Sequence, residues 1–519
     1  MKRIEHTKPH AEAPVAAVDA SSCDQAEQAA IVDAIDEANP AGPLAPEADA
    51  ARDAAEAKIA RMGTENTFKL LLEFSIPALA GVAVQMLYNI IDAVFVGHAV
   101  GANGLAATTV ANPFMMAMVA IAMLVGVGGN ALCAIRLGEA RKGEAERVMG
   151  NSFTLLLAAS FLIWAITALA LEPILRLTGA DDVIMPYAVD FVVVLVAACP
   201  LQSIAFGMNN FIRTAGHPNR ALGSMLIGTA CNVVLGYLFI VVFQWGMRGA
   251  GLATALSWLV SAVFVMEFFL RKGSPMPLRR RNLAVSWRIG LKVVVLGIAP
   301  AVTELGFAVS AALENNLLSF YGAADPLGVD GALAVMRVLA SVGMITFMPS
   351  MGIATGVQPL IGYNYGAKNY ARMKRALFQA IGLGAAISTP LWLSVIFFPN
   401  AYAGLFGLPQ EYMAETGWAL ILYLMFTPVL AIPIIGSNYF DATGQAVKAT
   451  VLTLTRQILF LIPLLIVCPQ VLPSFTPLTP VESVWFAPSI SDLTSTIVVG
   501  AFLLVEFRRL RKLERQAGV

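Results

Sequence analysis

The chain has 519 residues, of which 58% are hydrophobic and 13% are charged. Soluble domains carry roughly 25% charged residues, so this composition excludes an ordinary soluble protein and indicates a membrane protein. The 34 basic and 34 acidic side chains give a net charge of zero, which argues against a nucleic-acid partner. The five cysteines have no metal-ligand or redox-motif spacing, and we expect them to pack as small residues in helices.

The N-terminal region differs in composition from the rest of the chain. Residues 1–64 are rich in Ala, Asp, Glu and Pro, so we expect a disordered cytoplasmic tail. Residues 46–61 are rich in Ala and could instead form a short helix before the first span. No apolar stretch follows Lys2 and Arg3, which argues against a cleavable signal peptide.

Long apolar segments follow this region. A helix needs roughly 20 mostly apolar residues to cross a bilayer, and about twelve such segments occur, separated by Gly, Pro and charge clusters. We therefore expect an all-α membrane protein with twelve transmembrane helices. The expected spans are 68–97, 104–134, 148–172, 184–213, 221–244, 250–270, 289–319, 331–360, 376–399, 412–440, 449–471 and 485–507.

Basic residues mark one side of the membrane. They gather in connections at 136–142, 271–281, 368–375 and 508–512, whereas the opposite connections are nearly free of them. The positive-inside rule then places these connections and both termini in the cytoplasm. We expect a multi-pass protein of the cell inner (plasma) membrane.

The first span carries a polar stripe. Gln85, Tyr88, Asn89 and Asp92 recur at helical spacing, which places them on one face of the helix. A carboxylate in hydrocarbon costs about 2.5–3.5 kcal/mol on insertion scales, so it normally faces a cavity or a partner. We interpret Asp92 as a cation or proton site. The alternative is a carboxylate satisfied by Tyr88, Asn89 or neighbouring helices.

Three further polar residues lie inside later spans. Asn232 in the fifth span could offer an amide oxygen to an ion, or join two helices by a hydrogen bond. Thr254 in the sixth span is ordinary by itself. Glu304 in the seventh span follows Pro300 by one turn, and both a substrate counter-ion or proton carrier and a helix-packing role fit it.

The other charged residues of the spans have structural interpretations. Glu314, Arg337 and Asp492 fall in the outer parts of their spans, where an internal ion pair among them would offset the cost of desolvation. Arg456 and Asp441 lie toward the cytoplasmic ends of theirs. They could latch an inner gate, or extend to the membrane interface.

The hydrophobic part of the chain is duplicated. Four landmarks of the first half recur 228 positions later in the second half: Gly138 and Gly366, Pro200 and Pro428, Asn210 and Asn438, Gly216 and Gly444. Duplicated halves are typical of alternating-access transporters, which bind the substrate between the halves. We expect two lobes, 65–275 and 276–512, and a short cytoplasmic tail, 513–519.

The sequence contains no catalytic motif. No Gly-x-x-x-x-Gly-Lys-Ser/Thr loop occurs, which argues against an ATPase. No acidic pair lies within a span to hold magnesium, because Asp181 and Asp182 fall in an expected outer loop. We expect a transporter rather than an enzyme, with no cofactor other than a coupling ion, H⁺ or Na⁺.

Four sets of motifs resemble one family. They are Tyr-Asn-Ile-Ile-Asp-Ala-Val-Phe-Val-Gly at 88–97, Gln-Pro-Leu-Ile-Gly-Tyr-Asn-Tyr-Gly-Ala-Lys-Asn-Tyr at 358–370, the segment 209–216 with its repeat at 437–444, and 455–457 with 462–464. Over roughly 64–512 the chain resembles the bacterial branch of the multidrug and toxic compound extrusion (MATE) family. The resemblance implies two six-helix lobes related by a pseudo-two-fold axis. It also implies an antiporter that exports organic cations or drugs in exchange for protons or sodium ions.

The resemblance also implies a site in the first lobe. Family members of known mechanism combine a first-span Asp, an Asn and an Asp four residues apart in the fifth span, and a Thr in the sixth. The matching residues here are Asp92, Asn232, Gly236 and Thr254. Because Gly236 lacks the second carboxylate, a sodium site should be weak, since hard cations favour anionic oxygen. Proton coupling through Asp92 is therefore favoured, and Glu304 lies about one turn from the seventh-span acid of some branches.

Other functions remain open from the sequence alone. A lipid-linked sugar flippase of the same architecture would need a basic cavity for pyrophosphate, and the spans hold few Arg or Lys residues beyond Arg337 and Arg456. A non-transporting receptor would not need the repeat. We therefore expect small organic cations as substrates, the lipid bilayer as surroundings, and a monomer.

Overall fold

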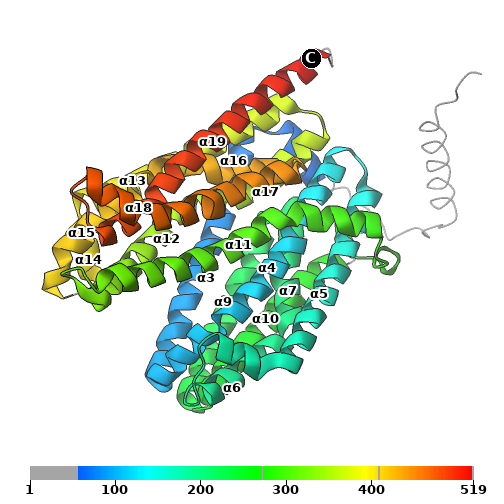
Figure 1. Cartoon of the computed structure of the whole chain (residues 1–519). Coiled ribbons are helices and arrows are strands. Elements are labelled where there is room, and N and C mark those ends of the chain that lie inside the picture. The colour runs from blue at the N-terminus through cyan, green and yellow to red at the C-terminus, as the bar shows by residue number, and fades with distance from the viewer. Residues whose placement is uncertain (1–56, 272, 407–408, 517–519) are drawn as a thin grey trace, which may run out of the picture. The chain divides into compact units, whose positions relative to one another are not determined.

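The computed structural model describes residues 57–271, 273–406 and 409–516, and within these ranges every regular element is a helix. Ten helices are long and apolar enough to cross a membrane, and two bent helix pairs raise the number to twelve when each pair is one span. The predicted all-α class with twelve spans is confirmed. Figure 1 shows the helices in their arrangement.

The first six spans run from α3 to α10. Their elements are α3 (Thr67–Ala99), α4 (Ala102–Gly138), α5 (Lys142–Leu177), α6 (Met185–Ala197), α7 (Cys199–Ser203), the π-helical turn η1 (Ile204–Met208), α8 (Asn209–Thr214), α9 (Pro218–Gly236), the π-helical turn η2 (Tyr237–Val242) and α10 (Gly246–Leu270). The fourth span bends by 54° between α6 and α7. Pro200 lies directly after this break. Proline cannot donate the backbone hydrogen bond that would continue the helix, which accounts for the bend.

The last six spans run from α11 to α19. A 3₁₀ turn, η3 (Arg280–Asn282), precedes them. Their elements are α11 (Trp287–Gly322), α12 (Gly328–Gly366), α13 (Tyr370–Phe397), α14 (Pro399–Leu405), α15 (Gln410–Leu424), the 3₁₀ turn η4 (Thr427–Val429), α16 (Ala431–Ala442), α17 (Ala446–Leu454), the π-helical turn η5 (Thr455–Phe460), α18 (Leu461–Phe475) and α19 (Pro480–Gln516). The tenth span bends by 47° beside Pro428. The repeated prolines therefore mark the two bent spans.

The repeat extends to the backbone of the turns. Ala140 and Lys368, which are 228 positions apart, both adopt left-handed conformations, with φ of 60° and 57°. Gly216 and Gly444 do the same with φ of 81° and 76°. Glycine adopts this conformation without steric cost, which explains why the sequence keeps it at both positions.

A pseudo-two-fold axis passes between α4 and α12. Asn130 Nδ2 donates to Gln358 Oε1 at 3.4 Å, and these two residues are 228 positions apart. Gly138 lies against the Tyr363 carbonyl, and Gly366 lies against the Ile135 carbonyl, so closely that a Cβ at either glycine would clash. The two contacts are equivalent under the repeat. They place the basic connections 136–142 and 368–375 at the same end of the molecule, as the distribution of basic residues predicted.

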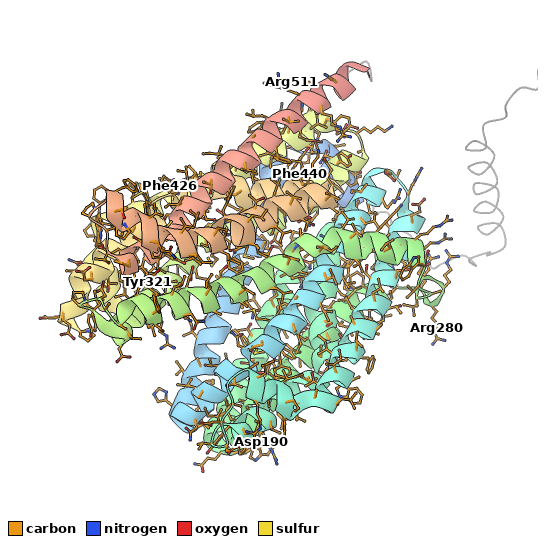
Figure 2. The ribbon with its side chains drawn as sticks, viewed as in Figure 1. Asp190, Arg280, Tyr321, Phe426, Phe440 and Arg511 are labelled. Carbon is orange, nitrogen blue, oxygen red and sulfur yellow. The ribbon has the colours of Figure 1, made fainter. Side chains whose placement is uncertain are left out.

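We call this end the basic end, because it carries the connections 136–142, 271–281 and 368–375 and the end of α19. Figure 2 shows Arg280 and Arg511 at the basic ends of the two lobes, far from Asp190 and Tyr321 at the opposite ends.

The first helix of each lobe begins against the other lobe. Leu70 and Phe74 of α3 lie in a buried cluster formed mainly by second-lobe residues. Val293 and Leu296 of α11 lie in a cluster formed mainly by first-lobe residues, and Figure 1 shows α11 alongside α4. The two lobes therefore share apolar cores at the basic end.

At the opposite end each lobe has a core of its own. One cluster, which includes Phe191 and Ile240, contains first-lobe residues, and another, which includes Leu339 and Trp485, contains second-lobe residues. Between the lobes, α3 and the start of α4 face α12 across a cavity of about 590 Å³. The lobes thus pack together at the basic end and separate toward the opposite end.

The structure differs from the expected tail just before α3. Residues 1–56 lie outside the described residues, but residues 57–64 are helical, as the alternative helix over 46–61 suggested in part. Ile59 and Met62 are only 7% and 1% exposed. Burial of these two apolar side chains fixes the segment, so the disordered tail predicted for 1–64 is wrong over 57–64.

Candidate functional site

A buried polar cluster lies inside the first lobe. Asn232 Nδ2 of α9 donates to Thr254 Oγ1 of α10 at 3.3 Å, and Tyr88 Oη of α3 lies 3.4 Å from the same Thr254 oxygen. The three side chains are between 1% and 8% exposed. The structure therefore brings together three of the residues named from the sequence. Thr254, which looked ordinary alone, is the shared partner.

Asp92 lies one helical turn beyond Tyr88 on α3. Its side chain is half-buried, and it makes no hydrogen bond or ion pair with the side chains that the structure describes. Helix α3 runs beside α9, with Gly81 against Met225 and Phe95 against Gly236. This register places Asp92 at the level of Asn232 and Gly236. A carboxylate here has neutral oxygen and amide groups nearby and no fixed cation, which suits reversible binding of a proton or a cation.

The remaining residues of the polar stripe contribute less. Gln85 is half-buried and has no hydrogen-bond partner in the described part of the chain. The side chain of Asn89 lies outside the described residues. The stripe itself is set by helical spacing, since α3 continues unbroken through Pro77.

Gly236 is the last residue of α9, directly before the π-helical turn η2. A Cβ at this position would lie 3.1 Å from the ring of Phe95. The site that the family resemblance implies therefore has no second carboxylate here, and an aromatic ring occupies the neighbouring space. A π-helical turn in this place shifts the register of the helix by one residue, a feature that is frequent at functional sites.

Glu304 lies in the other lobe. It is half-buried on α11 and has no hydrogen-bond or ion-pair partner among the described residues. The preceding Thr303 donates to the Ala299 carbonyl of its own helix at 2.9 Å. The structure does not join Glu304 to the first-lobe cluster.

The second lobe holds a buried ion pair. Arg456 Nε of η5 donates to Asp492 Oδ1 of α19 at 2.8 Å, and the guanidinium lies over the ring of Phe347 at 5.2 Å. The predicted pair among Glu314, Arg337 and Asp492 is therefore wrong. Arg456 also does not extend to the interface, because a buried partner on the adjacent span offsets its desolvation.

Asp441 likewise stays inside the protein. It is 6% exposed, and its Oδ1 has no hydrogen-bond partner among the described residues. It forms no latch with Arg456, which is paired elsewhere.

Glu314 lies on α11, the first helix of the second lobe. Glu314 is 7% exposed and interacts electrostatically with Tyr423, as do Arg456 and Asp492.

The cavity between the lobes has mainly apolar walls. Ile90, Val94 and Gly97 of α3 face Arg337 of α12 across it. These α3 residues lie on a different face from Tyr88 and Asp92, so the cavity and the polar cluster are on two sides of one helix. Sequence reasoning missed this role of Arg337, because only the packing of α12 against α3 shows where the side chain lies.

No group of three or more His, Cys, Asp or Glu side chains suited to a metal ion occurs in the described ranges. The first-lobe cluster offers one carboxylate and the neutral oxygens of Asn232 and Thr254. Such a donor set fits a proton, or a weakly held sodium ion, better than a divalent metal.

Comparisons with known proteins agree with this architecture. The family model MatE matches residues 77–238 and again 311–467, once in each half. The multidrug export protein MepA of Staphylococcus saprophyticus is 23% identical over 404 residues, covering 78% of this chain and 87% of that protein. MepA of Staphylococcus haemolyticus is 24% identical over 392 residues, covering 75% and 84%. A solved outward-facing multidrug resistance MATE transporter of the MOP superfamily superposes with a TM-score of 0.80 at 24% identity, covering 87% of this chain and 98% of that one.

Proposed function

Because the chain belongs to the MatE family, whose members are transporters and not enzymes, we propose that it is a secondary active antiporter. It exports organic cations or drugs in exchange for protons or sodium ions by alternating access. The observation that carries this proposal is Asp92, an unpaired carboxylate beside the buried cluster of Tyr88, Asn232 and Thr254. The export function assigned to the MepA relatives supports it.

The two faces of α3 have different roles in this proposal. The cavity-facing side contacts the substrate, with apolar residues such as Ile90 and Val94. The lobe-facing side holds the coupling ion at Asp92. Protonation or ion binding at Asp92 changes the charge buried beside Tyr88 and Thr254, and this change shifts the packing of α3 against α9 and α10. One helix thereby links the ion to the substrate.

Proton coupling is favoured over sodium coupling. Gly236 supplies no carboxylate, and the ring of Phe95 occupies the space beside it. A sodium ion would have Asp92 as its one anionic ligand, with Asn232 and Thr254 as neutral ones. Glu304, in the second lobe, is proposed as a counter-ion for the cationic substrate.

The protein is proposed to lie in the cell inner (plasma) membrane with its basic end and both termini in the cytoplasm. This orientation follows from the Arg and Lys residues of 136–142, 271–281 and 368–375. The cavity between the lobes then opens away from the cytoplasm. We propose that this arrangement is the state that releases substrate outside the cell, and that the monomer carries out transport.

Transport of a fluorescent organic cation into inverted membrane vesicles tests the proposal. Uptake driven by an imposed proton gradient without sodium is expected, with little uptake under a sodium gradient alone. Sodium-driven uptake would reassign the coupling ion. If neither gradient drives uptake and a lipid-linked sugar crosses the membrane instead, the alternative flippase function replaces antiport.

A further inference from the structure

The segment before the first span contacts both lobes at the basic end. We define residues 57–65 as the pre-span segment. Ile59 lies in the apolar cluster formed mainly by first-lobe residues, among them Phe211 and Ala215. Met62, three residues later, lies in the cluster formed mainly by second-lobe residues, among them Leu360 and Met373. Consecutive turns of one short helix therefore pack into the cores of two different lobes.

Polar contacts repeat this division. On the first-lobe side, Lys58 Nζ lies 3.4 Å from His217 Nε2, and Gly216 lies against the backbone of Lys58. His217 Nδ1 lies 2.9 Å from the Ala215 carbonyl. With the proton on Nδ1, Nε2 is left free to accept a hydrogen bond from Lys58. Burial also lowers the pKa of His217, which favours this neutral form.

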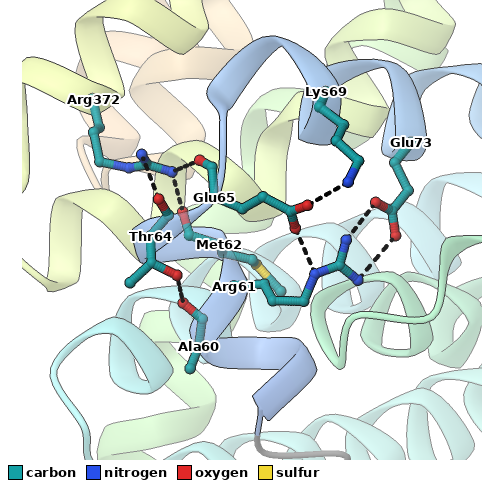
Figure 3. Close-up of polar contacts among 8 residues, drawn as sticks. All are labelled: Ala60, Arg61, Met62, Thr64, Glu65, Lys69, Glu73 and Arg372. Carbon is teal, nitrogen blue, oxygen red and sulfur yellow. Dashed lines mark hydrogen bonds and ion pairs between the residues drawn. The ribbon is translucent and has the colours of Figure 1, made fainter.

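On the second-lobe side, Arg372 of α13 binds the end of the pre-span segment. Its guanidinium donates to the carbonyls of Met62, at 3.2 Å, of Thr64, at 3.5 Å, and of Glu65, as Figure 3 shows. Asn364 adds a hydrogen bond to the Met62 carbonyl at 3.0 Å. The last carbonyls of a helix have no partners within the helix and carry partial negative charge. Arg372 supplies hydrogen-bond donors to these carbonyls, and its positive charge interacts favourably with their partial negative charge.

Ion pairs hold the segment in shape. Arg61 pairs with Glu65 and, at 2.9 Å, with Glu73 of α3, and Lys69 pairs with Glu65 at 2.6 Å. Hydrogen bonds from Arg61 and Lys69 lower the pKa of the Glu65 carboxyl to about 2. Glu65 therefore stays ionised at every physiological pH. These ion pairs stabilise the helical conformation of the segment and join it to the start of α3.

The second half of the chain has a matching arrangement. The residues before α11 are held by α5, the third span of the first lobe: Asn151 donates to the Asn282 carbonyl at 3.2 Å, and Thr154 to the Leu283 carbonyl at 2.8 Å. The pre-span segment is held by α13, the third span of the second lobe. In both halves, the backbone that leads into the first span is bound by the opposite lobe.

We propose that the pre-span segment is a latch that holds the cytoplasmic ends of the two lobes together, and that Arg372 fastens it. This rests on the proposed alternating access only for the direction of opening. When the lobes part at the basic end, either the Ile59 and Lys58 contacts or the Met62 and Arg372 contacts must break. The latch therefore stabilises the state that is closed toward the cytoplasm, and its release is part of each transport cycle.

Distances between spin labels on the two lobes test the latch without requiring transport. Cysteines introduced at Gly143 and Asn369, in a background without the native cysteines, lie at exposed positions of the basic end, one in each lobe. The parent protein should give mainly the short distance. Arg372→Ala should raise the ratio of open to closed molecules about tenfold, the value of one hydrogen bond to a charged group. Ile59→Ala should act in the same direction.

Arg375→Ala is the matched control. Arg375 is an exposed arginine on the same helix, and its removal should leave the distances unchanged. The double variant Ile59→Ala/Arg372→Ala should open no further than the stronger single variant, because both changes release one latch. Arg372→Lys keeps the charge without the planar fork and should open partly; it also serves if Arg372→Ala does not fold.

Unchanged distances in folded Arg372→Ala and Ile59→Ala proteins would overturn the latch, as would equal opening in Arg375→Ala. A protein that shows the predicted opening but no antiport would instead refute the proposed function and leave the latch intact.

Discussion

The two lobes follow one helical plan but enclose polar clusters of different charge. In the first lobe, Tyr88, Asn232 and Thr254 form a neutral group, and Asp92 beside them has no fixed cation. In the second lobe, Arg456 and Asp492 form a direct ion pair. Both clusters include residues of the fifth and sixth spans of their lobe.

This difference separates what the repeat preserves from what it does not. Glycines at Gly138 and Gly366 and left-handed turns at Ala140 and Lys368 are kept, because the backbone of each half depends on them. The charged side chains are not kept. A carboxylate without a fixed partner can bind and release a cation, whereas breaking a buried pair exposes two charges to a low-dielectric interior. This contrast supports the proposal that the first lobe carries the coupling ion and that the second-lobe pair is structural.

The sharpest test of this assignment is Asp92→Asn. The amide has the size of the carboxylate but cannot take up a coupling proton or supply an anionic ligand. Coupled uptake in inverted vesicles should fall to background, while the protein still inserts and unfolds at a temperature close to that of the parent. Uptake at the parent rate under a proton gradient would show that Asp92 is only structural, and the comparison between the lobes would fail.

Asp492→Asn should give the opposite pattern. The change leaves Arg456 buried without its counter-ion, which costs about 3 kcal/mol or more of stability. Thermal unfolding in detergent should show the loss. The paired variant Arg456→Leu/Asp492→Leu removes both charges and should recover most of it. If Asp492→Asn instead abolishes coupling with unchanged stability, then the second lobe also carries the ion.

The fold could be predicted from the sequence more completely than the partners of the second-lobe ion pair. Apolar length and the basic connections located twelve spans, and the repeat identified Pro200 and Pro428 as equivalent positions, beside which the structure shows the two bends. Partner choice depends on how each helix is rotated about its axis. Hydropathy does not determine that rotation, so the ion pair predicted among Glu314, Arg337 and Asp492 is not formed, and Asp492 instead pairs with Arg456.

The candidate site shows the same limit. The spacing of the polar stripe predicted a shared face for Tyr88 and Asp92, and the family resemblance added Asn232 and Thr254, which the structure brings to Tyr88. The pre-span segment could not be identified from its composition. Ile59 and Met62 are ordinary residues of an Ala-rich stretch. Their places depend on partners far along the chain: Ile59 packs in the cluster of Phe211 and Ala215, and the Met62 carbonyl accepts a hydrogen bond from Asn364. Local sequence patterns do not reveal such contacts.

Glu304→Gln tests the same difference between the two lobes, with a smaller expected effect on transport. As a half-buried group without a partner, Glu304 is proposed to attract the cationic substrate rather than carry the ion. Removing its charge should weaken apparent substrate affinity about fivefold, the value of roughly 1 kcal/mol for a partly solvated charge pair. Proton coupling should persist. Thr303→Val is the control, because the Thr303 hydroxyl bonds its own helix. A complete loss of coupling in Glu304→Gln would move the ion site to the second lobe.

The smallest effect is expected from Gly236→Asp. This change adds to the first lobe the second carboxylate that the family resemblance implies and that this chain lacks. The new side chain would start 3.1 Å from the Phe95 ring, so Phe95→Leu is introduced with it to provide space. Sodium should then protect the folded protein by about 0.8 kcal/mol when its concentration is roughly three times the dissociation constant. Gly236→Asn in the same background matches the size without the charge, and it separates sodium binding from altered packing between α3 and α9. Sodium-dependent shifts in thermal unfolding measure the difference between the two variants. If the Asp and Asn variants fold and respond equally to sodium, then Asp92, Asn232 and Thr254 do not form an ion site that a second carboxylate can complete, and the neutral cluster of the first lobe would need another explanation.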